Sequence, residues 1–217
     1  MRHDGLKGSF GRTLCEKCEK GEGLFRCKDC SHGSVLLCQA YLILKHGELE
    51  LHRVEVRLPL SSSIKDWPHR DHLPFQKWNG QFFEKTTLAS LGLRIQLGHD
   101  GGPCPCPSHG PQNFKFIVFN ISGAHAVNID YCGCTLDKPL DKRVQLLRKQ
   151  WFPATLSRPQ TVFTFDCLET FHELTLQGKV NLYDFYYTIL RKTDNAGIST
   201  SIVSQPSQEL VEMLTYH

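Results

Sequence analysis

The sequence contains no long apolar run. Its best stretch, residues 114–121, is far shorter than the roughly 20 apolar residues that a membrane-spanning helix requires. The N-terminal segment likewise lacks the apolar core of a secretory signal. We therefore expect a soluble, intracellular protein that makes no contact with a membrane. In a reducing compartment, its ten cysteines are better explained by metal binding than by disulfides.

A strong charge of one sign is also absent, since the formal net charge is +3 and the pI is about 8.3. A domain that mainly binds phosphates usually has a pI above about 9, and the pI of this chain is lower. Contact with nucleic acid is therefore permitted but not required. Basic residues gather near the start of the chain, where several acids offset them. These basic residues are Arg2, Lys7, Arg12, Lys17, Lys20, Arg26 and Lys28.

Signatures of catalysis are missing as well. The glycine-rich stretch 98–102 lacks the pattern of a phosphate-binding P-loop. A two-metal nuclease or transposase needs carboxylates that converge on ions about 3.5–4 Å apart, and the acids of this chain form no such frame. Most cysteines occur in pairs that suit metal ligands, so few thiolates remain as nucleophiles. We expect a non-catalytic chain without a small-molecule substrate. The acids considered are Asp130, Asp137, Asp141, Asp166, Asp184 and Asp194.

What the chain does contain is a ladder of paired cysteines and histidines near its start. Two cysteines separated by two residues occur twice, and a third such pair has tyrosine at its second position. Zinc takes four ligands in a tetrahedron, so each pair must be completed by another pair farther along the chain. Four pairs therefore predict two ions. The ladder comprises Cys15 and Cys18, Cys27 and Cys30, Cys38 and Tyr41, and His46 and His52.

The expected wiring is a cross-brace, in which alternate pairs share an ion. Site one then takes Cys15, Cys18 and Cys38, and site two takes Cys27, Cys30, His46 and His52. The phenol of Tyr41 is a poor zinc ligand because its pKa is near ~10. Water or His32 could complete site one, or this site could be weak or empty. The competing interpretation is that the cysteines are buried thiols or a disulfide framework.

A second group of cysteines follows, in two pairs with one residue between them. Residues 114–121 and 126–131 predict a β-hairpin across 122–125, which would return Cys132 and Cys134 to the level of Cys104 and Cys106. We call the expected zinc centre site three. Its ligands are Cys132, Cys134, Cys104 and one of His99, Cys106 or His109. In the alternative, these cysteines are merely small buried residues. The chain would hold two to three zinc ions in all.

Local patterns predict an α+β protein with a small zinc-stabilised cross-brace domain and a larger second domain. Strands are expected at 25–27, 35–38, 52–58, 93–97 and 158–165, besides the hairpin. Helices are expected at 39–45, with the end near Gly47, and at 82–91, 143–151, 167–176 and 181–192. The domains would span 13–58 and 77–195, with a linker at 59–76 and a partly disordered tail at 196–217.

Three of these helices carry further expectations. Helix 143–151 should bury Val144, Leu147 and Trp151 and expose the basic residues Arg143, Arg148 and Lys149. Helix 167–176 should turn Leu168, Phe171, Leu174 and Thr175 inward and contain Cys167 as a buried thiol. The aromatic residues of helix 181–192 are interpreted as core, with base stacking as the alternative.

Several motifs carry a resemblance to a known family. They include Trp78-Asn79-Gly80, Leu91-Gly92-Leu93-Arg94, Gly102-Pro103-Cys104, Cys132-Gly133-Cys134 and Trp151-Phe152-Pro153-Ala154-Thr155. This pattern, over about residues 15–195, resembles the C-x-C cysteine-cluster domain that accompanies KDZ transposases in fungi. The N-terminal ladder resembles B-box and treble-clef zinc modules, from which Tyr41 departs.

The resemblance implies a zinc-binding segment that precedes an RNase H-like catalytic domain and recognises nucleic acid or protein. We expect that a full transposase continues beyond Asp194 into its catalytic carboxylates, and that this chain lacks them. The leading hypothesis is a recognition module of a transposable element that contacts DNA through Arg143, Arg148, Lys149 and the basic N-terminal residues. The alternatives are a protein-interaction module and an inactive transposase fragment.

Overall fold

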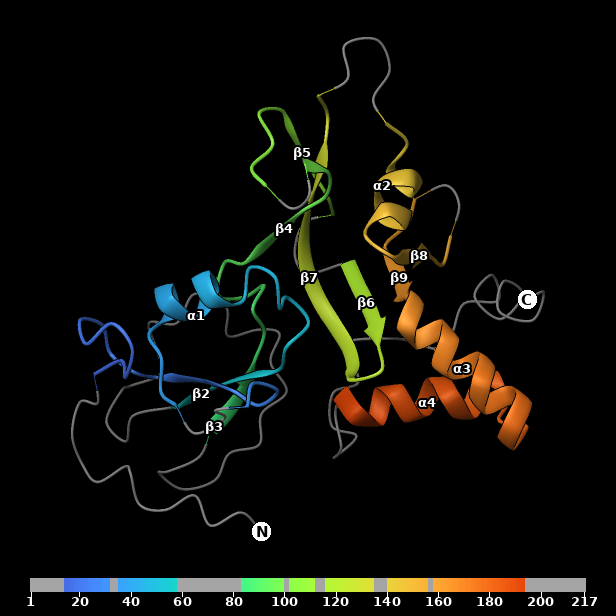
Figure 1. Cartoon of the computed structure of the whole chain (residues 1–217), viewed down its shortest axis with the longest axis horizontal. Helices are drawn as coiled ribbons and strands as arrows, with labels where there is room; N and C mark the ends of the chain where they lie inside the picture. Colours follow the sequence, from blue (N-terminus) through green and yellow to red (C-terminus); the bar gives the residue numbers. More distant parts are fainter. Residues whose placement is uncertain are drawn as a thin grey trace. The chain divides into compact units, whose positions relative to one another are not determined.

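A computed structural model describes residues 14–31, 35–57, 83–99, 102–111, 116–134, 140–155 and 158–193. Contacts divide the chain into two compact units, which we call unit one (residues 1–93) and unit two (residues 94–217) (Figure 1). Each unit is described by itself. The expected linker, 59–76, and the expected tail lie outside the described residues. Among the helices that the structure describes, none is long and apolar enough to cross a membrane.

Unit one is built on an antiparallel sheet of three strands. The strands are β1 (Phe25–Cys27), β2 (Val54–Arg57) and β3 (Phe83–Thr86), in the order β1-β2-β3. Side chains alternate between the two faces of a strand. One face therefore contributes Phe25, Cys27, Val54 and Val56 to a buried core, which Leu42 joins from helix α1 (Gln39–Lys45).

Two expectations for unit one need correction. Residues 82–91 were expected to form a helix, but the described part of this range, residues 83–91, forms β3 and a series of turns. The strand forms because its backbone pairs with β2, an interaction between distant segments that local sequence does not reveal. Residues 35–38 form no regular strand, although Leu37 makes an isolated bridge with Phe25. The contact division also places residues 83–93 in unit one, whereas the sequence assigned them to the second domain.

The six strands of unit two form one mixed sheet. They are β4 (Arg94–Gln96), β5 (Pro107–His109), β6 (Phe116–Asn120), β7 (Gly123–Cys132), β8 (Trp151–Pro153) and β9 (Thr161–Thr164). The order is β4-β7-β6-β9-β8, and β5 pairs separately with β7. The hairpin of β6 and β7 is confirmed, but its turn is only the two residues Ile121 and Ser122, shorter than expected.

Strand β7 positions the second group of cysteines. Its C-terminal half pairs in parallel with β4 and antiparallel with β5. The chain leaving β4 and the chain entering β5 therefore meet near the end of β7. This topology draws His99 and Cys104 toward Cys132 and Cys134, which lie at that end.

Helix α2 (Lys142–Arg148) differs from its expected form at one end and in its buried face. It buries Gln145 and Leu146, while Val144 and Leu147 are 37% and 40% exposed. The apolar stripe inferred from sequence was therefore wrong for Val144 and Leu147, whereas Trp151 and the adjacent Leu146 are buried. The helix stops early because Gln150 adopts a left-handed φ of 61°, which turns the chain so that Trp151 enters β8.

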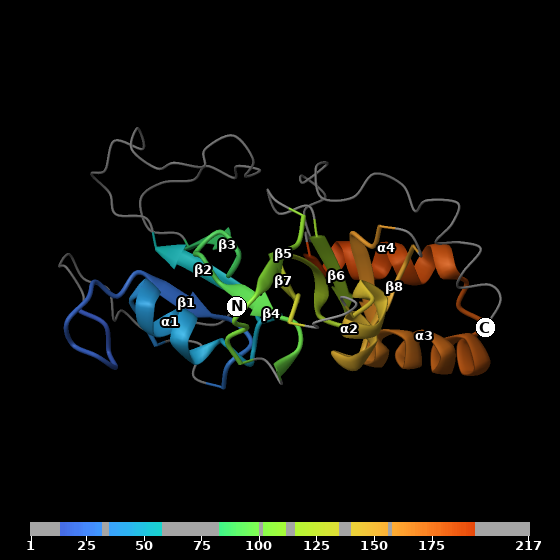
Figure 2. The ribbon, with the colours of Figure 1, turned by 90° about the horizontal axis from the view of Figure 1, so that it is seen from above.

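Helices α3 (Phe165–Gly178) and α4 (Leu182–Thr193) pack against the sheet of unit two (Figures 1 and 2). Their shared core contains Cys167, which is the expected buried thiol, together with Phe185 and Tyr186. The core interpretation of α4 is confirmed for these two aromatic residues, while Tyr183 is 61% exposed. On α3, Leu168 and Phe171 pack against this core, but Leu174 and Thr175 are exposed.

Candidate metal centres

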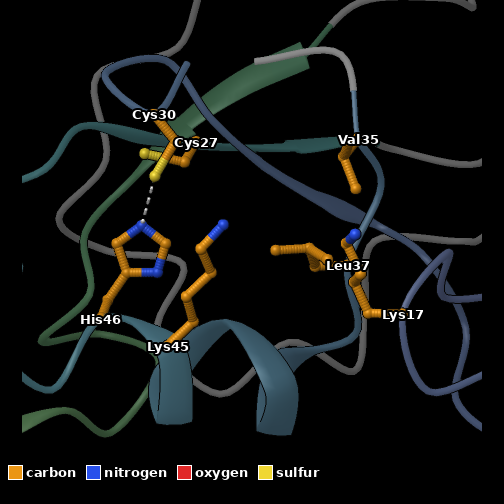
Figure 3. Close-up of a pocket in the computed structure, with 7 residues that line it drawn as sticks. All are labelled: Lys17, Cys27, Cys30, Val35, Leu37, Lys45 and His46. Atoms are coloured by element: carbon orange, nitrogen blue, oxygen red, sulfur yellow. Dashed lines mark hydrogen bonds between the residues drawn. The ribbon is translucent and has the colours of Figure 1, made fainter. Parts of the chain in front are cut away.

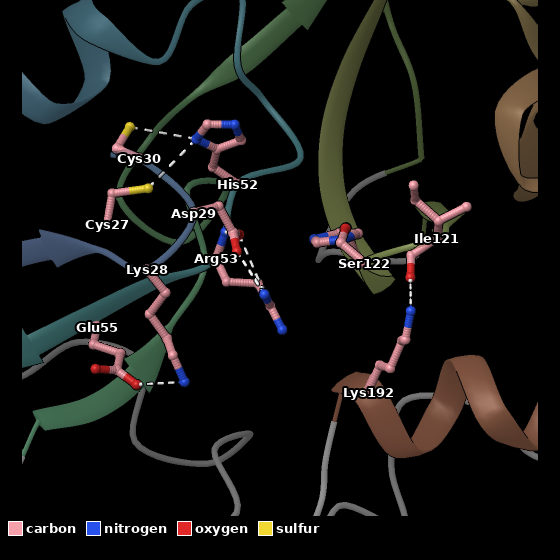
Figure 4. Close-up of polar contacts among 11 residues, drawn as sticks. Cys27, Lys28, Asp29, Cys30, His52, Arg53, Glu55, Ile121, Ser122 and Lys192 are labelled. Atoms are coloured by element: carbon pink, nitrogen blue, oxygen red, sulfur yellow. Dashed lines mark hydrogen bonds and ion pairs between the residues drawn. The ribbon is translucent and has the colours of Figure 1, made fainter. Parts of the chain in front are cut away.

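Site two brings four ligand atoms together from three segments of the chain. Cys27 ends β1 and Cys30 follows it, while His46 ends α1 and His52 precedes β2. His52 Nδ1 lies 3.4 Å from Cys27 Sγ and 3.5 Å from Cys30 Sγ (Figure 4). His46 Nε2 lies 3.5 Å from Cys30 Sγ. All four ligand atoms lie within 4.8 Å of one another.

The ring of His46 is held in the orientation that a metal ligand needs. Its Nδ1 donates a hydrogen bond of 2.8 Å to the Leu42 carbonyl, one turn earlier in α1. That bond leaves Nε2 without its proton and directed at the cysteines, as is common for metal-binding histidines. The ring is fully buried, and this burial lowers the pKa of His46. The neutral form is therefore favoured, and it is the form that binds metal.

A small recess lies beside site two (Figure 3). It is lined by the site's own cysteines and His46, and by the side chains of Lys17, Val35, Leu37 and Lys45. Its volume is about 10 Å³, which is close to the minimum that holds one water molecule. This recess is too small for an organic substrate.

Site one contains three cysteines. Cys18 Sγ lies 3.6 Å from Cys38 Sγ, and Cys15 is fully buried beside them. Gly21 lets the chain pass close to Cys38, because a Cβ atom at this position would lie only 2.8 Å from the Cys38 Cβ. Tyr41 is partly buried and packs against the core of unit one. His32 lies outside the described residues.

Backbone amides stabilise a thiolate in site one. Burial raises the pKa of Cys15, but hydrogen bonds from the backbone of Cys18, Cys38 and Lys17 outweigh it and lower that pKa to about 7. Amide groups that point at a sulfur in this way favour its charged form, which is the form that binds metal. The backbone around Cys15 thus favours the thiolate form of its side chain.

Site three is formed by His99, Cys104, Cys132 and Cys134, whose ligand atoms also lie within 4.8 Å of one another. Cys104 Sγ lies 3.3 Å from Cys134 Sγ, and His99 Nε2 lies 3.2 Å from Cys132 Sγ. Gly98 has a φ of 88°, and a Cβ there would approach the Cys132 Cβ to 2.9 Å. His99 itself has a left-handed φ of 49°, a strained conformation that is typical of functional positions.

The two other residues considered for site three lie elsewhere. Cys106 is exposed, and its carbonyl accepts a hydrogen bond of 3.0 Å from the amide of Gly133. His109 lies 2.5 Å from the carboxylate of Asp130 through its Nδ1. Asp130 also accepts hydrogen bonds from the guanidinium of Arg94. Of the three alternatives left open by the sequence, the structure groups His99 with the cysteines.

Gln145 supports site three and was missed by the sequence analysis. Its side-chain oxygen accepts a hydrogen bond of 2.7 Å from the amide of Cys132. Its side-chain nitrogen donates to the carbonyls of Cys132 and Leu140, each at 3.0 Å. Gln145 is only 2% exposed. The sequence carries no local signal for this role, because the burial of Gln145 becomes visible only in the structure. A buried amide must find hydrogen-bond partners.

Hydrogen bonds within site three shift the pKa values of two of its cysteines in opposite directions. Burial raises the pKa of Cys104, but hydrogen bonds from Cys134 and from the backbone of Cys106 and Gly133 lower it to about 7. The same bond with Cys104, together with burial, raises the pKa of Cys134 to about 12. A divalent cation would displace the proton of Cys134, because metal binding requires both sulfurs as thiolates.

The distances fit a tetrahedral ion. A tetrahedron with Zn–S bonds of about 2.3 Å has sulfur atoms roughly 3.8 Å apart, and Zn–N bonds of about 2.0 Å shorten the S···N edges to roughly 3.5 Å. The observed S···S distances are 3.6 Å in site one and 3.3 Å in site three. The S···N distances in site two are 3.4–3.5 Å. The three groups could therefore hold metal ions, and their ligand atoms would need to move only slightly to bind them.

The basic and acidic residues singled out from sequence occupy ordinary structural positions. Arg143 is exposed, but its guanidinium donates to the carboxylate of Asp141, which also caps α2. Arg148 is exposed and Lys149 is half-buried. Asp184 lies at the start of α4, where its amide donates a hydrogen bond of 2.9 Å to Asn181 Oδ1 and its carboxylate accepts one of 2.8 Å from the Asn181 side chain. Asp166 lies in the first turn of α3. Asp137 and Asp194 lie outside the described residues.

The fold and the three ligand groups define a cysteine-rich α+β protein with candidate metal centres in both units. A family model described as a CxC2 like cysteine cluster associated with KDZ transposases matches residues 88–197, just over half of the chain. The chain belongs to this family. The match includes every residue of site three, whereas sites one and two precede it. No curated protein and no solved structure matches the chain.

Proposed function

We propose that this chain is a zinc-binding, non-catalytic recognition module of a KDZ-type transposable element, and that it contacts DNA in the nucleus. The observation that carries the proposal is the pair of complete four-ligand groups, one in each unit. Sets of Cys₂His₂ and Cys₃His are typical of structural zinc sites, in which the ion is closed off by protein ligands. Zinc would stabilise both units and leave their surfaces for recognition.

A non-catalytic role is consistent with the use of the acidic residues. Asp130 is held by Arg94 and His109, and Asp141 is held by Arg143. A carboxylate engaged by an arginine is poorly placed to bind a catalytic magnesium ion, which needs several converging oxygen ligands. The catalytic step of transposition would therefore depend on another domain or another chain.

DNA contact is proposed for the exposed side of α2. Arg143 and Arg148 are exposed there, and Lys149 follows the helix. Their positive charge exceeds that of Asp141, and positively charged side chains bind DNA by displacing counterions from phosphates. The short helix offers few groups for reading bases, so contacts of this kind would position the protein without specifying a sequence.

Filter binding of duplex DNA at a series of salt concentrations tests this proposal. The logarithm of the binding constant should fall linearly with the logarithm of the salt concentration, by about 0.9 per phosphate contacted. Replacing Arg148 with glutamine should reduce this slope by about one. Arg191→Gln is the matched control, because Arg191 also lies exposed in the last turn of a helix. Affinity that is indifferent to salt would reject phosphate contact.

A protein-interaction module is the second candidate, and the same helix supports it. Val144 and Leu147 of α2 are 37% and 40% exposed, between basic residues. Exposed apolar side chains beside charges are common at protein interfaces. Zinc-dependent capture of a protein partner, with no DNA retained, would favour this function. Substitution of Leu147 by serine should then weaken capture and leave any DNA affinity unchanged.

A further inference from the structure

The second half of helix α3 runs away from the sheet of unit two (Figures 1 and 2). Its first half packs against the core through Cys167 and Phe171, whereas every residue in 172–179 is exposed. Leu174 is 41% exposed and Leu176 is 62% exposed. Apolar residues of a helix normally face a neighbouring element. The exposed leucines therefore mark this end of α3 as a surface for contact with another molecule.

One side of α3 carries a row of acids. The row follows intervals of three and four residues, so its side chains lie on one face of the helix. We call it the acidic face of α3, and its exposed residues are Asp166, Glu169, Glu173 and Leu176. Among the described residues, no cation forms an ion pair with these three carboxylates. The acidic face thus offers negative charge, next to an exposed leucine, to a basic partner.

Helix α2 has a face of the opposite charge, on the side away from the buried Gln145. We call it the basic face of α2, and its exposed residues are Arg143, Val144, Leu147 and Arg148. This face combines two cations with two apolar side chains. The carboxylate of Asp141 accepts hydrogen bonds from the guanidinium of Arg143. Arg148 is therefore the cation that is better placed to meet a partner.

The two faces match each other in charge and in apolar content. Arg148 would meet Glu173, while Leu147 would pack against Leu176. Opposite charges across an interface speed up the encounter and fix its register. Within one copy, α2 packs beside β8, and the end of α3 lies away from it in both views (Figures 1 and 2). The two faces are therefore available to meet between two copies of the chain.

We propose that two copies of this chain associate through the basic face of α2 and the acidic face of α3. A two-fold axis brings each α2 against the α3 of the other copy, so that both contacts form at once and the assembly closes as a dimer. Contacts between two short helices are small, so the dissociation constant should lie in the micromolar range. The inference goes beyond the DNA role proposed above and does not depend on it. Duplex DNA and the second copy would compete for α2.

Sedimentation equilibrium of the whole, metal-loaded chain tests the proposal. The unsubstituted chain should show a monomer–dimer equilibrium that shifts toward the monomer as the salt concentration rises. Arg148→Glu and Glu173→Arg each place like charges in both contacts of the dimer, and each should raise the dissociation constant about tenfold. Arg191→Glu on α4 and Glu48→Arg in unit one are matched controls. They reverse exposed charges outside the two faces and should leave the dissociation constant unchanged.

A mixture of the two weakened variants gives a result that damage to the fold cannot imitate. In a mixed pair, each α2–α3 contact again joins opposite charges. An equimolar mixture of the Arg148→Glu and Glu173→Arg chains should therefore dimerise with nearly the affinity of the unsubstituted chain. A mixture that stays monomeric would overturn the proposal, as would controls that weaken association equally. A monomeric unsubstituted chain would also overturn it without touching the DNA role, whereas a dimer that fails to bind duplex would reject only the DNA role.

Discussion

Replacing Cys30 with serine should release one metal ion and unfold unit one. The free energy with which zinc-finger peptides bind structural zinc is about 10–16 kcal/mol near neutral pH, which is as large as the whole stability of most domains. Among the described residues of unit one, His46 is fully buried and its ring faces Cys30 in site two. Hydrogen exchange should lose protection across β1, α1 and β2. Inductively coupled plasma mass spectrometry should find at least one ion fewer, because site one lies in the same unit.

Cys167→Ser is the matched control for this experiment. Cys167 is also fully buried, but it lies between α3 and the sheet and is not grouped with the ligands of the described residues. Burial raises the pKa of this thiol to about 12, so it remains protonated. Its replacement should cost about 1–3 kcal/mol through a buried hydroxyl and leave the metal content unchanged. Equal loss of metal in both variants would show that unfolding, and not ligation, releases the ion.

Replacing His99 with alanine should weaken metal binding at site three by more than about 100-fold. Loss of groups that merely orient a ligand already costs about 10–100-fold, and loss of a ligand itself should exceed that range. The affinity is measured by competition with a chromophoric chelator. When cobalt replaces zinc, the absorption spectrum of the unsubstituted protein should be that of a cobalt ion bound by three thiolates and one nitrogen. The spectrum of the His99→Ala variant should differ, because the nitrogen ligand is missing.

The controls for site three are the two residues that the structure separates from it. His109→Ala should leave the affinity for metal unchanged and cost unit two about 1 kcal/mol, because it removes a hydrogen bond to Asp130. Cys106→Ser should change neither quantity, since its side chain is exposed. Release of the ion by either of these substitutions, with no effect of His99→Ala, would contradict the arrangement of ligands described here.

The sequence predicted the groups of ligands well where spacing restricts geometry. Two residues between cysteines form a turn that faces both sulfurs to one point, and alternation of pairs then determines which pairs meet. Helix α1 was also predicted with its start at Gln39, although the sequence placed its end near Gly47 and the helix ends at Lys45. His46 follows the helix, and its ring lies near Cys30. These features depend on short segments, for which local chemistry is informative.

Features that depend on distant partners were not predictable. β3 was read as a helix because the phenylalanines and threonines of its sequence do not reveal pairing with β2 across the intervening residues. The choice of His99 over His109 depends on β5, whose pairing with β7 turns His109 toward Asp130. The buried face of α2 was misjudged because Gln145 is polar, yet it is buried to hold the backbone of Cys132.

The zinc content of the purified whole chain, measured with its sulfur content under reducing conditions, tests the central claim most directly. The account predicts at least two zinc ions per chain, one at each four-ligand group, and up to one more at the three cysteines of site one. A strong chelator should remove them and abolish cooperative unfolding. A chain that contains no metal, and whose folding is unaffected by the chelator, would contradict the account.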